Sequence, residues 1–216
     1  MKIHEYKGKD IVILYDVKRC IHAAQCVAGS KAVFNPDQKP WVNADAASPE
    51  TIASIVQRCP SGALHYQVDD SELTERPDAS NTVVTSVDGP LYVRGNITVV
   101  TEAGEDVLSD LRVALCRCGA SKNKPLCDGS HHAVAFEDPG MAPPGEGAKS
   151  EMATSGKMRV VATTNGPLHL QGQVTVKNAA KQTIFEGTEA WLCRCGGSST
   201  KPFCDGTHER IGFKAE

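Results

Sequence analysis

The chain has 216 residues, of which 40% are hydrophobic and 5% aromatic, so any hydrophobic core must be modest. Its formal net charge of -3 provides no basic surface for nucleic acid or an anionic membrane. The longest apolar run near the N-terminus is residues 11–15, too short for a signal-peptide core or a membrane span. We therefore expect a cytoplasmic protein with no nucleic-acid or membrane partner.

The chain contains nine cysteines, an odd number in a sequence without a secretory signal. This argues against a disulfide framework and favours metal or redox chemistry. The cysteines sort into three groups of three, which unrelated structural cysteines would not do. The groups are Cys20, Cys26 and Cys59; Cys116, Cys118 and Cys127; and Cys193, Cys195 and Cys204.

The elements predicted near the N-terminus are a strand, a helix and a second strand. Residues 11–15 are apolar and mostly β-branched, which is typical of a buried strand. Ser48 and Pro49 predict a helix start, as N-cap and first helical residue. The helix should end at Cys59, because the proline that follows disfavours the helical conformation of the residue before it. Residues 63–66 predict a short closing strand.

The cysteines of this region have a recognisable order. Cys20 and Cys26 stand at the outer positions of a Cys-x2-Cys-x2-Cys run, and Cys59 precedes a proline. This order resembles a divergent single-cluster ferredoxin, because bacterial ferredoxins pair such a run with a remote Cys-Pro. The resemblance implies a ferredoxin-like domain over residues 1–76 that binds a cluster through these three cysteines.

The middle position of the run is Ala23, which cannot bind iron. A [4Fe–4S] cube would then have one iron without a thiolate. Either that iron is absent, giving [3Fe–4S], or His22 or water caps it. The ligand count favours [3Fe–4S], with [4Fe–4S] as the alternative. A third interpretation is that the three cysteines are simply small buried apolar residues.

Two polar stretches are predicted linkers. One covers residues 69–81 and contains Pro77, and the other covers residues 138–157 and is rich in Pro and Gly. They delimit two repeat domains, residues 82–137 and 158–216.

The two repeat domains are related by a constant offset of 77 residues. Gly89-Pro90-Leu91 matches Gly166-Pro167-Leu168, and Phe136 matches Phe213, with no gap between. Such a repeat predicts one fold unit used twice. Each unit should contain short strands joined by glycine turns, and a loop bearing the cysteines at one end. The expected strands are 91–93 and 97–100 around Gly95, 113–115, 168–170, 174–176 and 190–192.

Each repeat carries the same spacing of thiolate and imidazole donors, Cys-x-Cys followed eight residues later by Cys and three further on by His. Such a spacing, present twice, indicates a metal site, and thiolates are the soft donors that iron–sulfur clusters need. The donors are Cys116, Cys118, Cys127 and His131 in the first copy, and Cys193, Cys195, Cys204 and His208 in the second.

The run Cys127-Asp-Gly-Ser-His131, and its counterpart ending at His208, resemble the CDGSH iron–sulfur family over residues 82–137 and 158–214. The resemblance implies a [2Fe–2S] cluster held by three Cys and one His in each copy. The family also implies homodimers that exchange strands and set their clusters side by side. We therefore predict an α+β protein, monomeric, whose two β-rich CDGSH units form an intramolecular pseudo-dimer.

The histidine ligand has chemical consequences. A neutral imidazole in place of a thiolate removes one negative charge, which should raise the cluster potential as it does in Rieske centres. The imidazole can also take up a proton in competition with iron. A zinc site with three Cys and one His is the structural alternative, although this spacing is not that of the usual paired knuckles.

The predicted function is single-electron transfer through two [2Fe–2S] clusters and one ferredoxin-type cluster, between redox proteins that the sequence does not identify. The alternative is a cluster carrier that serves apo-proteins, or a redox, pH or iron sensor that uses the lability of His-ligated clusters. The sequence shows no Gly-x-Gly-x-x-Gly fingerprint, no Walker loop and no nucleophile–base constellation, so we do not expect an enzyme.

Overall fold

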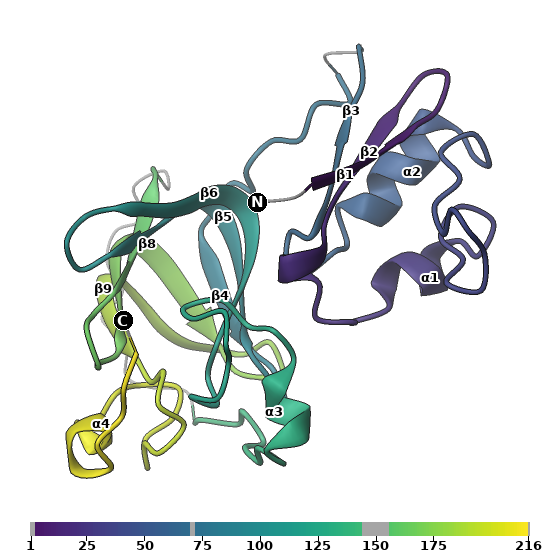
Figure 1. Ribbon diagram of the computed structural model, residues 1–216. Coiled ribbons are helices and arrows are strands. Elements are labelled where there is room, and N and C mark those ends of the chain that lie inside the picture. Colours follow the sequence, from purple (N-terminus) through teal and green to yellow (C-terminus); the bar gives the residue numbers. More distant parts are fainter. Residues whose placement is uncertain (1–2, 70–71, 144–155, 216) are drawn as a thin grey trace. The chain divides into compact units, whose positions relative to one another are not determined.

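The computed structural model describes residues 3–69, 72–143 and 156–215 (Figure 1). The chain divides into a unit over residues 1–76, called here the N-terminal unit, and one over residues 77–216, the C-terminal unit. Of the predicted linkers, most of 138–157 and two residues of 69–81 lie outside the described residues. No helix in the described ranges is long and apolar enough to cross a membrane.

The N-terminal unit contains a three-stranded antiparallel sheet in the order β1-β2-β3. The strands are β1 (Ile3–Lys7), β2 (Val12–Asp16) and β3 (Leu64–Gln67). The central strand β2 corresponds to the apolar run of the sequence, and β3 to the predicted closing strand. Strand β1 was not predicted, because its residues are mostly polar and its side chains are exposed or half-buried.

Three helical segments follow in this unit: η1 (Val17–Arg19), α1 (Gln25–Gly29) and α2 (Pro49–Val56). Helix α2 starts as predicted, with the Ser48 hydroxyl accepting from the Thr51 amide at 3.4 Å. It ends at Val56 rather than at Cys59, because Cys59 closes a tighter turn in which its amide donates to the Val56 carbonyl at 2.9 Å. Its buried face, which includes Ile52 and Ile55, packs into the core of the unit.

The C-terminal unit is β-rich, and its described helices, α3 (Ser130–Ala133) and α4 (Thr207–Arg210), are single turns. Six strands form one sheet. The first repeat supplies β4 (Thr82–Thr85), β5 (Leu91–Thr101) and β6 (Asp106–Leu115), and the second supplies β7 (Met158–Ala162), β8 (Leu168–Lys177) and β9 (Thr183–Leu192).

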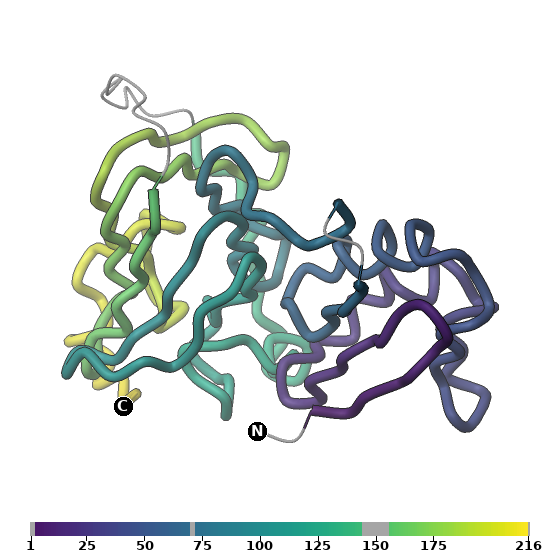
Figure 2. Tube along the Cα trace, turned by 90° about the horizontal axis from the view of Figure 1, so that it is seen from above, coloured from purple at the N-terminus to yellow at the C-terminus, as the bar shows by residue number. Residues whose placement is uncertain are grey.

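The strands of the two repeats interleave (Figures 1 and 2). Strand β4 pairs with β5 of its own repeat and runs parallel to β8 of the other. Strand β7 pairs with β8 of its own repeat and runs parallel to β5 of the other. The four pairings close into a ring, and one buried cluster that includes Val83, Leu91, Val160 and Leu168 fills it. The two repeats therefore share a single hydrophobic core.

The glycine turns predicted inside the repeats are wrong. Strand β5 runs continuously through Gly95, and β8 through Gly172, and a register shift marks each place. A Cβ on Gly95 would stand 2.2 Å from the Asn81 side-chain oxygen, which accepts from the Asn96 amide at 2.9 Å. The glycine is required by this close approach within a β-bulge, and it does not reverse the chain.

Candidate metal centres

Each Cys/His set lies in a loop that begins at the end of a long strand, called here the first (116–131) and second (193–208) ligand loops. In the first, the Cys116 amide donates to the Pro125 carbonyl and the Cys127 amide to the Ala114 carbonyl, both at 2.9 Å. The second repeats this pattern from Cys193 at 2.8 Å and Cys204 at 2.9 Å. The third cysteine of each loop is therefore returned to the strand end that carries the first.

Within each loop the donor atoms lie in pairs. The sulfurs of Cys116 and Cys118 are 3.8 Å apart, and those of Cys193 and Cys195 are 3.7 Å apart. Two sulfurs bound at about 2.3 Å to one tetrahedral metal would lie about 3.8 Å apart. Each Cys-x-Cys pair therefore has the spacing of two thiolates on one metal ion.

The third cysteine and the histidine form a second pair. The Cys127 sulfur is 3.5 Å from His131 Nδ1, and the Cys204 sulfur is 3.4 Å from His208 Nδ1. A sulfur and a ring nitrogen on one tetrahedral metal would lie about 3.6 Å apart. In the described part of the chain, no group of three or more His, Cys, Asp or Glu side chains could hold a single metal ion. The four donor atoms of each ligand loop therefore lie as two separate pairs.

The turn between the third cysteine and the histidine is fixed by its own aspartate and glycine. The Asp128 carboxylate accepts from the Ser130 amide at 3.0 Å and from the Lys122 amide at 2.8 Å. Burial acts to raise the pKa of Asp128, but these hydrogen bonds together outweigh it and lower the pKa. Gly129 adopts φ 87° ahead of α3, a conformation that strains other residues. The second loop repeats the turn with Asp205.

The thiols of the first loop differ in acidity. A hydrogen bond from Cys116 lowers the pKa of Cys118 to about 6, whereas burial raises the pKa of Cys127 to about 11. Backbone amides also point at sulfur, from Ala120 to Cys118 at 3.5 Å and from Gly129 to Cys127 at 3.4 Å. The loop thus supplies hydrogen bonds to thiolates, the form in which cysteines bind a metal.

The buried arginines Arg117 and Arg194, which sequence reasoning missed, anchor the loops. Arg117 Nε donates to the Gly89 carbonyl at 2.8 Å, and Arg194 Nε to the Gly166 carbonyl at 3.0 Å. Each guanidinium also lies over the repeated phenylalanine, with distances to the ring centroids of 5.1 and 5.5 Å. The sequence did contain a signal for this role of the arginines, because the repeated motif is Cys-Arg-Cys and not merely Cys-x-Cys.

The two ligand loops contact each other. A Cβ on Gly119 would stand 2.5 Å from the Cys195 carbonyl oxygen, and one on Gly196 would stand 2.8 Å from that of Cys118. Both glycines have positive φ, 78° and 82°. This symmetrical contact places the two sets of donors side by side.

One buried cation in this region has an unsatisfied donor. Arg194 is 1% exposed, and its Nη1 has no hydrogen-bond partner among the described residues. An uncompensated buried charge is costly. Burial lowers the pKa of Arg194, and the nearby Cys116 opposes this shift. Three thiolates with an iron–sulfur core would supply an anion beside the guanidinium. The residues present therefore fit an anionic cluster.

The N-terminal cysteines line a common cavity. Cys20, Cys26 and Cys59 surround an enclosed space of about 30 Å³, called here the cysteine cavity, together with Ala23. Burial raises the pKa of Cys26, and the nearby thiols of Cys59 and Cys20 raise it further. In a cubane-type cluster each iron takes one thiolate, so three cysteines around one space fit such a group.

His22 lines an adjoining outer cavity of about 650 Å³ and is absent from the lining of the cysteine cavity, although Cys20, Cys26, Tyr15 and Trp41 line both. His22 and Ala24 both adopt positive φ, 55° and 56°, which is uncommon outside glycine and is found at functional sites. The Tyr15 hydroxyl, which the sequence analysis did not single out, forms a hydrogen bond with Cys20. Burial raises the pKa of Tyr15, and this hydrogen bond raises it further.

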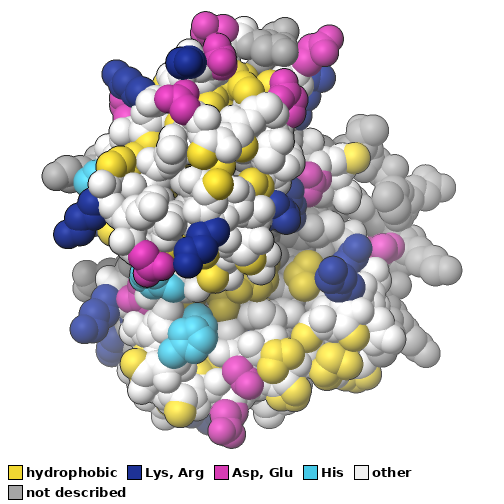
Figure 3. All heavy atoms as spheres, turned by 90° about the vertical axis from the view of Figure 1, so that its right-hand side faces the viewer, with side chains coloured by type: hydrophobic (Ala, Val, Ile, Leu, Met, Phe, Trp, Pro, Cys, Tyr) yellow, Lys and Arg dark blue, Asp and Glu magenta, His cyan; other side chains and the backbone are white. Residues whose placement is uncertain are grey.

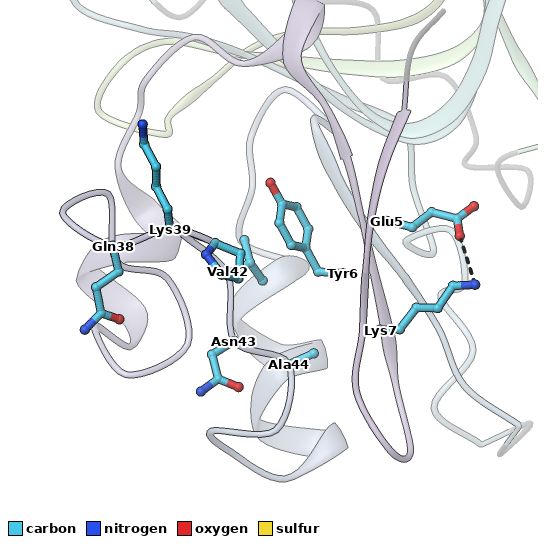
Figure 4. Close-up of a pocket in the computed structure, with 9 residues that line it drawn as sticks. Glu5, Tyr6, Lys7, Gln38, Lys39, Val42, Asn43 and Ala44 are labelled. Atoms are coloured by element: carbon cyan, nitrogen blue, oxygen red, sulfur yellow. Dashed lines mark ion pairs between the residues drawn. The ribbon is translucent and has the colours of Figure 1, made fainter.

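A second hollow of the N-terminal unit shares Tyr6 and Lys39 with the outer cavity (Figure 4). It has a volume of about 680 Å³ and lies between β1 and residues 38–44, with the Glu5–Lys7 ion pair at its edge at 3.7 Å.

On the face of the molecule shown in Figure 3, acidic and basic side chains are interspersed.

Comparisons with known proteins identify families for both units. The model of a divergent 4Fe-4S mono-cluster family matches residues 6–69, and that of the iron-binding zinc finger of CDGSH type matches residues 88–132 and 165–209. The described geometry and these matches define an iron–sulfur protein. The chain belongs to these families, with one divergent 4Fe-4S mono-cluster domain followed by two CDGSH units.

Two similar proteins each match part of the chain. The "Uncharacterized protein YjdI" of Escherichia coli (strain K12) is 36% identical over 62 residues, which cover 29% of this chain and 82% of the relative. The protein of the same name from Escherichia coli O157:H7 matches with the same identity and coverage. No solved structure matches the chain.

Proposed function

We propose that this protein transfers single electrons through three iron–sulfur centres. Two would be [2Fe–2S] clusters, each held by one ligand loop through three cysteines and one histidine. The third would be a [3Fe–4S] cluster in the cysteine cavity. When bound, such clusters accept and donate one electron at a time.

The observation that carries the proposal is the arrangement of donors in pairs. A [2Fe–2S] cluster needs two protein ligands on each of two irons, and each ligand loop offers one Cys–Cys and one Cys–His pair at 3.4–3.8 Å. A zinc ion would need all four donors around one point. The paired spacing therefore favours iron–sulfur chemistry over the zinc alternative.

Interleaved strands support the intramolecular pseudo-dimer that we propose for the C-terminal unit. Each repeat places its first short strand against the long central strand of the other, β4 on β8 and β7 on β5. The mutual approach of Gly119 and Gly196 to the opposite loop has the same two-fold character. The two clusters would then be neighbours, which suits electron exchange between them.

For the N-terminal cluster, the ligand count favours [3Fe–4S] over [4Fe–4S]. Ala23 lines the cysteine cavity and offers no donor, whereas His22 lines the outer cavity, which Cys20 and Cys26 also line. The three cysteines would hold three irons. Ala23 would add no fourth ligand.

Iron and sulfide analysis with electron paramagnetic resonance tests this function. Two [2Fe–2S] and one [3Fe–4S] clusters contain roughly seven irons and eight sulfides per chain. The oxidised protein should show the paramagnetic signal of one [3Fe–4S] cluster, and on reduction this signal should be replaced by those of two [2Fe–2S] clusters. A colourless protein that contains zinc would refute the proposal.

A second candidate, cluster delivery to apo-proteins, is favoured by the partial exposure of Cys118, Cys195 and Cys204. A partly exposed ligand allows an incoming thiolate to reach the metal. Mixing the holo-protein with an apo-ferredoxin separates the two uses. Transfer of the visible spectrum within minutes supports delivery, whereas reversible reduction without transfer supports electron relay between redox proteins of the cytoplasm.

A further inference from the structure

The outer cavity of the N-terminal unit, which the proposed function does not use, has the size and chemistry of a ligand-binding site. Its volume of about 650 Å³ lies within the range of small-molecule sites, roughly 300–1,000 Å³. Apolar and aromatic side chains make up most of its lining and a few polar ones join them, which is the usual composition of such sites. The cavity is therefore a candidate site for a small molecule.

The aromatic part of this lining is held in place. The Trp41 ring contacts three other rings, with centroid distances of 5.0 Å to Tyr15, 5.9 Å to Phe34 and 6.2 Å to Tyr6. Tyr6 and Tyr15 meet it edge-on, and Phe34 is fully buried in the core of the unit. A ring fixed in this way loses little conformational freedom when a ligand stacks on it. The surface therefore favours a planar aromatic molecule.

The charges of the lining favour an anion. Lys39 lines the cavity, and no carboxylate does so in the described part of the chain. In Figure 4 the side chains of Tyr6 and Lys39 extend to the same side, one from β1 and the other from the segment 38–44. Lys31, by contrast, is paired with Asp37 at 3.3 Å and lies outside the lining. An anionic group on the ligand would find its counter-charge at Lys39.

The outer cavity and the cysteine cavity differ in the cysteines that line them. Cys59 lines only the cysteine cavity, so a cluster bound by all three cysteines lies on that side. Cys20 and Cys26 line both cavities. A molecule in the outer cavity would therefore lie next to two of the residues that hold the proposed N-terminal cluster.

We propose that the outer cavity binds a planar aromatic molecule with an anionic group, its ring against Trp41 and its charge beside Lys39. This inference goes beyond the proposed function, because the site itself requires no cluster. Its position connects it with that function, since the bound ring would lie beside Cys20 and Cys26. A small aromatic molecule, rather than a protein, would reach the N-terminal cluster by this route.

Isothermal titration calorimetry of the full-length holo-protein tests the site. The probes are naphthalene-2-sulfonate and 2-naphthol, which share one ring system, and only the sulfonate is charged at neutral pH. We expect saturable binding of one sulfonate per chain. Lys39→Gln should weaken this binding about fivefold, the effect of losing one exposed ion pair, and should leave 2-naphthol binding unchanged. Lys31→Gln is the matched control and should change neither.

A second variant tests the aromatic surface. Trp41→Leu should weaken the binding of both probes about tenfold, because each loses the ring on which it stacks. Trp191→Leu changes the other tryptophan of the chain, which is 44% exposed in the C-terminal unit, and should affect neither. In electron paramagnetic resonance, the sulfonate should alter the [3Fe–4S] signal of the oxidised protein and leave the [2Fe–2S] signals of the reduced protein unchanged.

The inference would be overturned by no binding, by binding that neither Lys39→Gln nor Trp41→Leu weakens, or by binding to the apo-protein that is lost in the holo-protein. The last result would show that the outer cavity is part of the cluster's own space. A holo-protein without a [3Fe–4S] signal would refute the assignment of the N-terminal cluster and leave calorimetry to decide the site. Should Trp41→Leu fail to fold, Lys39→Gln still decides, because Lys39 is exposed.

Discussion

The cysteine cavity of the N-terminal unit and the ligand loops of the C-terminal unit hold their donors by different means. The cavity draws Cys20, Cys26 and Cys59 from separate segments, one of them just after α2. Each ligand loop carries all its donors within 16 residues and is anchored by a buried arginine. The comparison teaches that a short donor run needs a rigid anchor, whereas scattered donors depend on the fold of their whole unit.

The largest expected effect is the loss of one centre. Cys59→Ser removes one of three donors from the cysteine cavity, so the N-terminal cluster should be lost and the iron content should fall by roughly three per chain. The two units should respond independently, and the [2Fe–2S] signals should remain. Loss of all three spectra would show that the units are not independent in this sense.

Adding a donor sharpens the same comparison. Ala23→Cys places a thiol on the cysteine cavity and should convert [3Fe–4S] to [4Fe–4S], a gain of about one iron that abolishes the oxidised paramagnetic signal. His22→Cys is the matched control. It should leave the signal unchanged, because Ala23 lines the cysteine cavity and residue 22 is not among the residues lining it. Conversion by His22→Cys and not by Ala23→Cys would reverse the assignment of the open corner.

Removing an anchor tests the dependence of the loops on arginine. Arg117→Gln leaves the half-buried Asp138 carboxylate without its 2.6 Å partner, although Lys201 Nζ remains 3.8 Å away, and should lower the free energy of unfolding of the C-terminal unit by about 1–3 kcal/mol. Arg94→Gln breaks the exposed pair with Asp78 and should cost less than about 1 kcal/mol. Thermal unfolding monitored by circular dichroism compares them, and equal losses would contradict the anchoring role.

The smallest effect concerns the contact between the loops. Gly119→Ala and Gly129→Ala both place a side chain at positive φ, which should cost about 1–2 kcal/mol. Only Gly119→Ala also meets backbone, at 2.5 Å from the Cys195 oxygen, whereas nothing lies within 4 Å at Gly129. Denaturant titrations should therefore show a larger loss for Gly119→Ala. Similar losses would mean that the loops do not press on each other.

What the sequence predicts well here is local. Fixed spacings placed Cys127 next to His131, and Ser48 at the start of α2, because both depend on neighbours within a few residues. Pairings between distant segments were not predictable from one sequence. The parallel contacts of β4 and β7 join different repeats, and the bulge at Gly95 depends on Asn81. The roles of Arg117 and Arg194 likewise depend on carbonyls far along the chain, so only their repetition hinted at them.

The central claim is that the two units hold different kinds of cluster, and quantitative electron paramagnetic resonance of the intact protein tests it most directly. We predict about one [3Fe–4S] spin per chain in the oxidised protein, and about two [2Fe–2S] spins after full reduction with dithionite. An oxidised sample without a paramagnetic signal, or a reduced one with no [2Fe–2S] spins, would contradict it.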